Sequence, residues 1–132
     1  RDYYASRGLG DVYKRQGVPL ERLTLSSDGN GSMPKFNENN ELIGLTAAAP
    51  RYLYEEMLSI VKAGVLPFDK ALQLITCNVA DALKLEDKGR IAVGKDADLI
   101  VWNDDLTLNK VFARGRLMVD EGQAVVKGTF EN

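Results

Sequence analysis

Histidine is missing from this sequence: none of its 132 residues is a histidine. Histidine is the commonest protein ligand for zinc and the usual general base near neutral pH. A zinc centre or an acid–base site made from this chain alone would therefore lack its usual side chains. We expect any hydrolytic site within the chain to be incomplete.

Cysteine, long hydrophobic runs and blocks of one charge are also scarce. The single Cys77 cannot form an internal disulfide, and no run approaches the roughly 18 apolar residues that a membrane span needs. The 17 basic and 19 acidic residues give a net charge of −2, with no basic block suited to nucleic acid or an anionic membrane surface. These features argue against nucleic acid and membrane as partners, and they favour a reducing compartment such as the cytoplasm.

What is present is enough for an ordinary folded domain, because 45% of the residues are hydrophobic. Residues 1–16 stand apart, since they show neither helical nor strand periodicity and resemble a translated sequencing adapter. We set them aside as an artefactual leader and expect the chain to be truncated at its N-terminal side. The order of signals that follows, a strand, then helices, then a small sheet, predicts an α/β fold.

The first orderly stretch predicts a strand that ends in a tight turn. Residues 22–26 form a short β-prone run, and residues 27–32, Ser-Asp-Gly-Asn-Gly-Ser, carry the glycines and small polar residues of a turn. Asp28 therefore lies at a strand's end. Residues 33–46 are rich in asparagine between apolar flanks, which predicts a small excursion or hairpin over a site.

Three helices are predicted next. One starts near Pro50, repeats apolar residues on one face and ends at Gly64. A second begins at Pro67 and runs to about residue 75. A third, short helix is predicted to be capped by Asn78.

Beyond Gly89 the pattern changes to short strands separated by glycines. We expect a small antiparallel sheet from Ile91 to Lys127, with turns at residues 114–116 and 120–122. The expected strands are residues 90–91, 98–102, 111–113, 117–119 and 124–126.

Two segments resemble the end of an amidohydrolase. Residues 76–83, Thr-Cys-Asn-Val-Ala-Asp-Ala-Leu, are similar to the helix that closes the barrel of such enzymes. Residues 89–102, with the run Gly-Lys-Asp-Ala-Asp-Leu, are similar to the superfamily's return into a small β-sandwich. Deacetylases, hydantoinases and dihydroorotases share this run. Residues 23–32 and 126–131 narrow the resemblance to β-aspartyl (isoaspartyl) dipeptidases.

The resemblance implies a larger parent enzyme with a metal-dependent (β/α)8 barrel and a β-sandwich. Residues 17–88 would be the last strand and helices of the barrel, and residues 89–132 would be part of the sandwich. Family members hold two zinc ions with histidines, a bridging carboxylated lysine and an aspartate after the eighth strand. Asp28 matches that aspartate, so the resemblance makes it a metal ligand and a catalytic residue. It also implies a homo-oligomeric full-length enzyme.

Elementary chemistry supports a catalytic Asp28, since a carboxylate beside metal-bound water can take its proton and pass it to the leaving amine. The competing reading is an aspartate that only stabilises its own turn. Ser32 matches a substrate-contacting serine of the family, against the alternative of a solvated loop serine. Asp96 and Asp98 are predicted to serve a turn rather than a metal, and Cys77 to be a small buried residue rather than a nucleophile.

These observations predict a parent enzyme that hydrolyses β-aspartyl (isoaspartyl) dipeptides, with a small isoaspartyl peptide as substrate. The 132-residue chain is expected to be inactive alone. Two alternatives stay open: another amidohydrolase, such as a D-aminoacylase or a deacetylase, and a structural fragment without catalysis.

Overall fold

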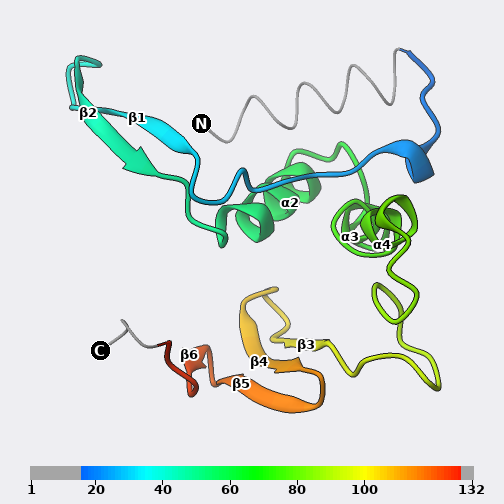
Figure 1. Ribbon diagram of the computed structural model, residues 1–132. Helices are drawn as coiled ribbons and strands as arrows, with labels where there is room; N and C mark the ends of the chain where they lie inside the picture. The colour runs from blue at the N-terminus through cyan, green and yellow to red at the C-terminus, as the bar shows by residue number, and fades with distance from the viewer. Residues whose placement is uncertain (1–15, 129–132) are drawn as a thin grey trace. The chain divides into compact units, whose positions relative to one another are not determined.

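The computed structural model describes residues 16–128, which divide into two units at Ala82 and Leu83. The first unit holds a hairpin and helices, and the second holds a sheet (Figure 1). The expected leader, residues 1–16, lies almost wholly outside the described residues. The assignment of the two units to a barrel and a sandwich stays a prediction.

Three helices form the body of the first unit, as the sequence predicts. They are α2 (Tyr52–Lys62), α3 (Phe68–Gln73) and α4 (Cys77–Leu83). Gly64, which adopts a φ of 65° just after α2, ends the first of them. Pro67 stands in extended conformation directly before α3 and starts the second.

The core of the first unit is made by the apolar faces of these helices and by the segment that precedes the hairpin. Met57, Ile60, Ala71 and Leu74 are fully buried. Leu20 belongs to the same cluster, and the partly buried residues 23 and 25 pack against it. Burying each large side chain of this kind contributes about 1.5–3 kcal/mol. The segment crossing over α2 in Figure 1 is therefore fixed by hydrophobic contact.

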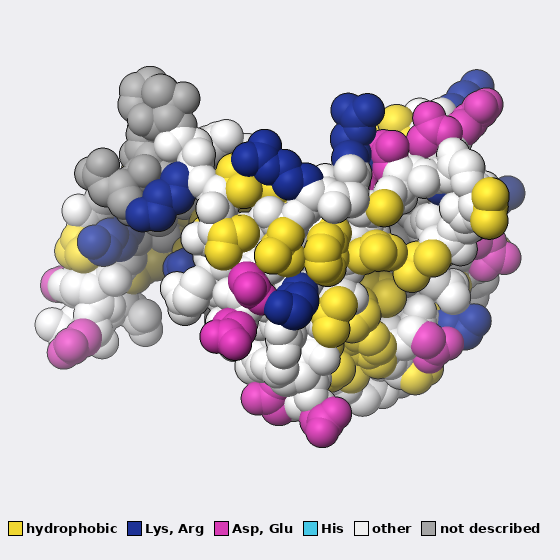
Figure 2. Space-filling model, turned by 90° about the horizontal axis from the view of Figure 1, so that it is seen from below, with side chains coloured by type: hydrophobic (Ala, Val, Ile, Leu, Met, Phe, Trp, Pro, Cys, Tyr) yellow, Lys and Arg dark blue, Asp and Glu magenta, His cyan; other side chains and the backbone are white. Residues whose placement is uncertain are grey.

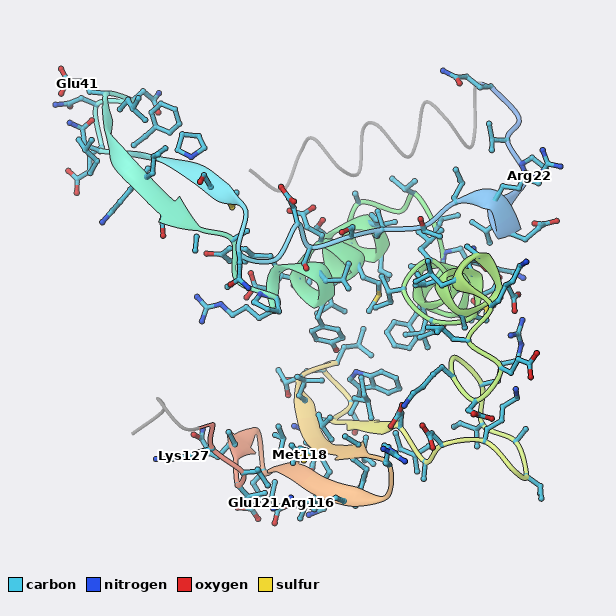
Figure 3. All side chains as sticks on the ribbon, in the orientation of Figure 1. Arg22, Glu41, Arg116, Met118, Glu121 and Lys127 are labelled. Atoms are coloured by element: carbon cyan, nitrogen blue, oxygen red, sulfur yellow. The ribbon has the colours of Figure 1, made fainter. Side chains whose placement is uncertain are left out.

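The predicted strand at residues 22–26 is wrong. The chain forms a 3-10 turn, η2 (Leu20–Arg22), and then runs on without strand pairing. Arg22 points its side chain outward from this turn (Figure 3). A β-prone run becomes a strand only when a neighbour accepts and donates its backbone hydrogen bonds. Within residues 16–128 no strand pairs with this segment, and no barrel is closed.

The predicted hairpin is confirmed. Strands β1 (Ser32–Phe36) and β2 (Leu42–Ala47) pair antiparallel, with a bulge at Lys35 and Phe36. Glu41 lies at the tip (Figure 3), where its carboxylate accepts a hydrogen bond of 2.7 Å from the Asn37 side chain.

The second unit is a four-stranded antiparallel meander, again as predicted. Its strands are β3 (Leu99–Trp102), β4 (Leu108–Ala113), β5 (Arg116–Asp120) and β6 (Gln123–Ala124), in that order. Two-residue turns join the last three strands: Arg114 and Gly115 have φ values of 50° and 78°, and Glu121 and Gly122 have 47° and 75°. Positive φ at both positions is the requirement of a type I′ hairpin turn.

One of the expected strands in this unit is wrong, and the expected strand at residues 124–126 is placed slightly too late. Residues 90–91 lie in a loop, where Ile91 is 87% exposed, and residues 125–126 lie beyond β6. The loop is held instead by the Asp96 amide, which donates to the Asp87 carbonyl at 3.0 Å. The described part of this unit contains one sheet, so the expected sandwich stays a prediction.

Hydrophobic side chains also reach the surface. Figure 2 shows hydrophobic side chains, in yellow, at several places on the face that it presents, among acidic and basic groups. The exposed large hydrophobic residues include Phe36, Leu42, Ile43 and Leu45 of the hairpin.

None of the helices within residues 16–128 has the length and apolar character that crossing a bilayer requires.

Candidate active site

The candidate site is built on a turn of four residues between η2 and β1. The Gly31 amide donates to the Asp28 carbonyl at 2.8 Å and closes the turn. Asn30, at the third position, adopts a φ of 65°, as the third residue of a type II turn does. Asp28 itself has a φ of 48°, and its amide donates to the Ser26 hydroxyl at 3.3 Å. Asp28 as a residue is exposed to solvent.

Gly31 determines where the Asp28 carboxylate lies. A Cβ placed on Gly31 would stand 2.7 Å from Asp28 Oδ2, 2.8 Å from the Asp28 carbonyl oxygen and 2.9 Å from Asp28 Cγ. Real side chains do not approach so closely, so only glycine allows the carboxylate to rest there. The turn therefore reverses the chain and also packs the carboxylate of Asp28 against Gly31, the fourth residue of the turn.

The turn is anchored on its C-terminal side by Ala48. The Asn30 amide donates to the Ala48 carbonyl at 3.0 Å, and the Ala48 amide donates to the Gly31 carbonyl at 2.9 Å. Ala48 is 2% exposed. These bonds continue the pairing of the hairpin up to the turn, so the hairpin and the turn are one connected element.

The N-terminal side of the turn is anchored by the helices. The Leu25 amide donates to the Leu74 carbonyl at 3.0 Å. The Asn78 side chain donates from Nδ2 to the Leu20 carbonyl at 2.7 Å and to the Leu23 carbonyl at 2.8 Å. The segment leading to Asp28 is thus fixed at three places before the turn begins.

This role of Asn78 was not predicted, because Asn78 was expected at the helix N-cap. Asn78 is instead the second residue of α4, and its side chain is buried. A buried amide needs partners, and here the partners are two carbonyls far away in sequence. The available signal was an asparagine directly before the apolar pair Val79 and Ala80.

Ser32, the expected substrate-binding residue, is the first residue of β1 and is exposed. The structure thus places it just beyond the turn that carries Asp28. The two candidate residues lie on one short, anchored connection.

Metal ligands are few in the part of the chain that is described. No group of three or more His, Cys, Asp or Glu residues that could hold a metal ion occurs among residues 16–128. Asp28, an exposed carboxylate at the head of an anchored turn, fits the role of one donor. The remaining donors of any metal centre would come from outside these residues.

Asp98 bonds a turn, as predicted from the sequence, while Asp96 is held in ion pairs. Lys88 Nζ lies 2.7 Å from Asp96 Oδ2 and 2.5 Å from Asp98 Oδ2. The other oxygen of Asp98 accepts a bond of 2.7 Å from the Arg114 amide, which lies in the hairpin turn between β4 and β5. These carboxylates therefore tie the loop of residues 87–98 to the sheet.

This cluster shifts two pKa values. Hydrogen bonds to Asp96 and then Asp98 raise the pKa of Lys88 above its ordinary value. The hydrogen bond from Lys88, followed by the one from the Arg114 amide, lowers the pKa of Asp98 below its ordinary value of 3.8. An ionised Asp98 therefore stabilises the fold above that ordinary value, and the stabilisation is lost as the pH falls through the lower folded-state pKa.

Cys77 is half-buried on α4, in keeping with the small packing residue that was predicted. Its Sγ lies 4.0 Å from the Gln73 carbonyl oxygen, one helical turn earlier, and 3.6 Å from Asn78 Oδ1. The thiol thus contacts groups of its own helix region.

The comparisons with known proteins agree with the resemblance at the level of the family. The sequence model of the amidohydrolase family matches residues 6–122, and the chain therefore belongs to this family. The match includes residues 6–16, which the sequence analysis set apart as a leader.

Solved structures of similar fold include two kinds of enzyme. One is a β-aspartyl dipeptidase from Fervidobacterium islandicum AW-1 in complex with β-Asp-Leu, with a TM-score of 0.72 and 30% identity over 89% of this chain. Another is the N-acetylglucosamine-6-phosphate deacetylase of Thermotoga maritima, with a TM-score of 0.66 and 19% identity over 88% of this chain. At 19% identity, the similarity to the deacetylase indicates a similar fold only.

Among curated proteins, the similar ones include adenine deaminases. Adenine deaminase 1 of Carboxydothermus hydrogenoformans is 26% identical over 122 residues, which are 87% of this chain and 20% of that protein. The adenine deaminase of Geobacillus kaustophilus is 42% identical over 67 residues, which are 49% of this chain and 11% of that protein. The chain thus spans a fifth or less of these relatives and 31% of the solved dipeptidase chain.

Proposed function

We propose that the full-length enzyme containing this chain hydrolyses the β-aspartyl peptide bond of short isoaspartyl peptides and releases aspartate. The observation that supports this most directly is the likeness to the β-aspartyl dipeptidase of Fervidobacterium islandicum, at a TM-score of 0.72. The resemblance of residues 23–32, which contain the Asp28 turn, points to the same class.

Asp28 is the residue to which we assign the proton transfer. Amidohydrolases are generally metal-dependent, and a bound metal ion, zinc by resemblance, would lower the pKa of a coordinated water to near neutrality. Asp28 would be one ligand of that metal. Its carboxylate takes a proton from the attacking water and later donates it to the leaving amine, so one group acts as base and then as acid.

The geometry of the turn suits this role. A proton carrier needs a defined position and access to the reacting groups. The contact with Gly31 and the bonds through Ala48 supply the position, and the solvent exposure of Asp28 supplies the access.

Ser32 is assigned to substrate binding. Its hydroxyl is exposed at the start of β1, directly after the turn, and can donate a hydrogen bond to a carboxylate of the substrate. A dipeptide with a β-linked aspartate carries free carboxylates on both residues, so such a donor favours this class of substrate.

A second candidate is the hydrolytic deamination of adenine. The sequence similarity to adenine deaminases, 42% identity over 67 residues, favours it. The assigned proton transfer is the same in both reactions, because Asp28 would protonate the amino group that leaves as ammonia instead of the amine of a peptide. The two candidate functions therefore differ in their substrate and not in the role of Asp28.

The test is a substrate panel on the full-length, metal-loaded enzyme. β-Asp-Leu, adenine and N-acetylglucosamine 6-phosphate are compared by the release of aspartate, ammonia and acetate. We expect β-Asp-Leu to give the highest kcat/KM. Turnover of adenine without cleavage of β-Asp-Leu would establish the second candidate, and acetate release alone would establish a deacetylase.

The role of Asp28 is tested in the same enzyme with Asp28→Asn, which keeps the size of the side chain but cannot accept a proton near neutral pH. We expect kcat to fall by about 10² or more. Metal content is measured in parallel, since loss of the metal would mimic loss of the proton carrier. Turnover close to wild type in the metal-loaded variant would refute the assignment.

A further inference from the structure

A buried amide on α4 connects the helices to the segment that carries Asp28. Asn78 is 4% exposed, and its Nδ2 donates to two backbone carbonyls, those of Leu20 at 2.7 Å and Leu23 at 2.8 Å. These acceptors lie 58 and 55 residues away along the chain. A side-chain amide has two N–H donors, and here both are used on the same segment.

The two acceptors are brought together by the local fold of η2. The Leu23 amide donates to the Leu20 carbonyl at 3.0 Å, so the chain makes one tight turn there. Two residues later the Leu25 amide donates to the Leu74 carbonyl, just after α3. The segment is therefore held by α4 at its start and by the end of α3 at its end.

We propose that Asn78 is a positioning residue for Asp28. It fixes the path of the chain at Leu20 and Leu23. The bond from the Leu25 amide to the Leu74 carbonyl continues this anchoring, and Asp28 follows three residues later. On the other side of the turn, Ala48 fixes Gly31, so the carboxylate stands between two anchored points. Asn78 is buried, with both of its Nδ2 hydrogen bonds made to this segment, and acts through the Asp28 turn. This inference rests on the proposed catalytic role of Asp28.

A residue that only stabilises the fold would also be buried and hydrogen-bonded, so the experiment separates the two roles. Asn78→Ala, Asp28→Asn and the double variant are prepared in the full-length enzyme, and kcat and KM are measured for β-Asp-Leu with metal content checked. Thr76→Val is the matched control. It removes the bond of 2.8 Å from the Thr76 hydroxyl to the Leu72 carbonyl, two residues from Asn78, without touching the Asp28 segment.

We expect Asn78→Ala to lower kcat by about ten- to hundredfold, because small misplacements of a catalytic group are costly, and to leave KM nearly unchanged. In the Asp28→Asn background the same change should have no further effect on kcat, since residues that act as one unit are not additive. Thr76→Val should keep kcat within about twofold of wild type.

Equal losses from Asn78→Ala in both backgrounds would overturn the inference, and so would a wild-type kcat for Asn78→Ala beside a strong defect in Asp28→Asn. Wild-type turnover by Asp28→Asn would instead overturn the proposed role of Asp28, and the positioning role with it.

A second measurement needs no variant and holds even if Asn78→Ala does not fold. In the unmodified enzyme, amide exchange at Leu25 should be as slow as at Ala80, whose amide lies within the helical region. Exchange at Leu25 as fast as in an exposed turn would show that the segment is not fixed, and the positioning role would be refuted.

Discussion

The two glycines of the Asp28 turn offer a matched pair of substitutions with opposite expected results. Neither Gly29 nor Gly31 has a φ in the left-handed region, so an alanine at either position meets no backbone penalty of that kind. The difference between them lies only in what the new Cβ would contact. At Gly31 it would stand under 3.0 Å from three atoms of Asp28: two atoms of the side chain, which can rotate, and the backbone carbonyl oxygen, which cannot.

At Gly29 the new Cβ would lie 3.3 Å from the Ser27 hydroxyl oxygen and 3.8 Å from Pro50 Cγ. The nearer of these is the end of a small side chain that can rotate away, so Gly29→Ala should be tolerated. Gly31→Ala must push the Asp28 carboxylate and stretch the turn bond of 2.8 Å. Forced overpacking of this kind costs about 1–3 kcal/mol of stability.

The catalytic effect follows from the displaced carboxylate. A misplacement of about 1 Å can lower turnover by about 10². We therefore expect Gly31→Ala in the full-length enzyme to lose about that factor in kcat on β-Asp-Leu, and Gly29→Ala to stay close to wild type. Urea midpoints measured in parallel report the loss of stability. Equal kcat and equal midpoints for the two variants would refute the argument that Gly31 determines where the carboxylate lies.

Three further outcomes are expected. Ser32→Ala should raise KM for β-Asp-Leu by about tenfold or more with little change in kcat, because a lost hydrogen bond to a charged group costs about 1.5–3 kcal/mol; an unchanged KM would leave Ser32 without a role in binding. Asp98→Asn should shrink the difference between urea midpoints at about pH 7 and about pH 3, because it removes a carboxylate whose pKa is lowered by folding; the full wild-type difference would contradict this. The isolated 132-residue chain should release no aspartate from the dipeptide with added zinc, and measurable release would contradict the incomplete donor set.

Local sequence signals predicted the helices and the turns well. Pro67 marks the start of a helix because proline restricts φ, and Gly64 marks the end of one because glycine permits a positive φ. Neither effect depends on the surrounding residues. The same holds for Gly115 and Gly122, which allow the type I′ turns of the meander. Features that depend on the backbone geometry of one or two residues can be predicted from a single sequence.

Features that depend on a distant partner were not predictable in the same way. Residues 22–26 have the composition of a strand, but strand formation needs a neighbouring strand. Asn78 looks like a helix cap until the carbonyls of Leu20 and Leu23 are known to lie beside it. For Asp28 the sequence predicted the turn, while its catalytic role came from resemblance and remains to be tested.

The hairpin of β1 and β2 has a practical consequence for anyone who purifies this chain. Leu45 is 72% exposed, Phe36 and Leu42 are exposed on paired positions, and within residues 16–128 the hairpin is a sheet of only two strands. Apolar side chains on an open strand edge promote aggregation between copies of a protein. We therefore expect concentrated preparations of the chain to aggregate through contacts of the hairpin, without unfolding of the helical core. A single lysine at position 45 is a remedy that leaves the core and the Asp28 turn untouched.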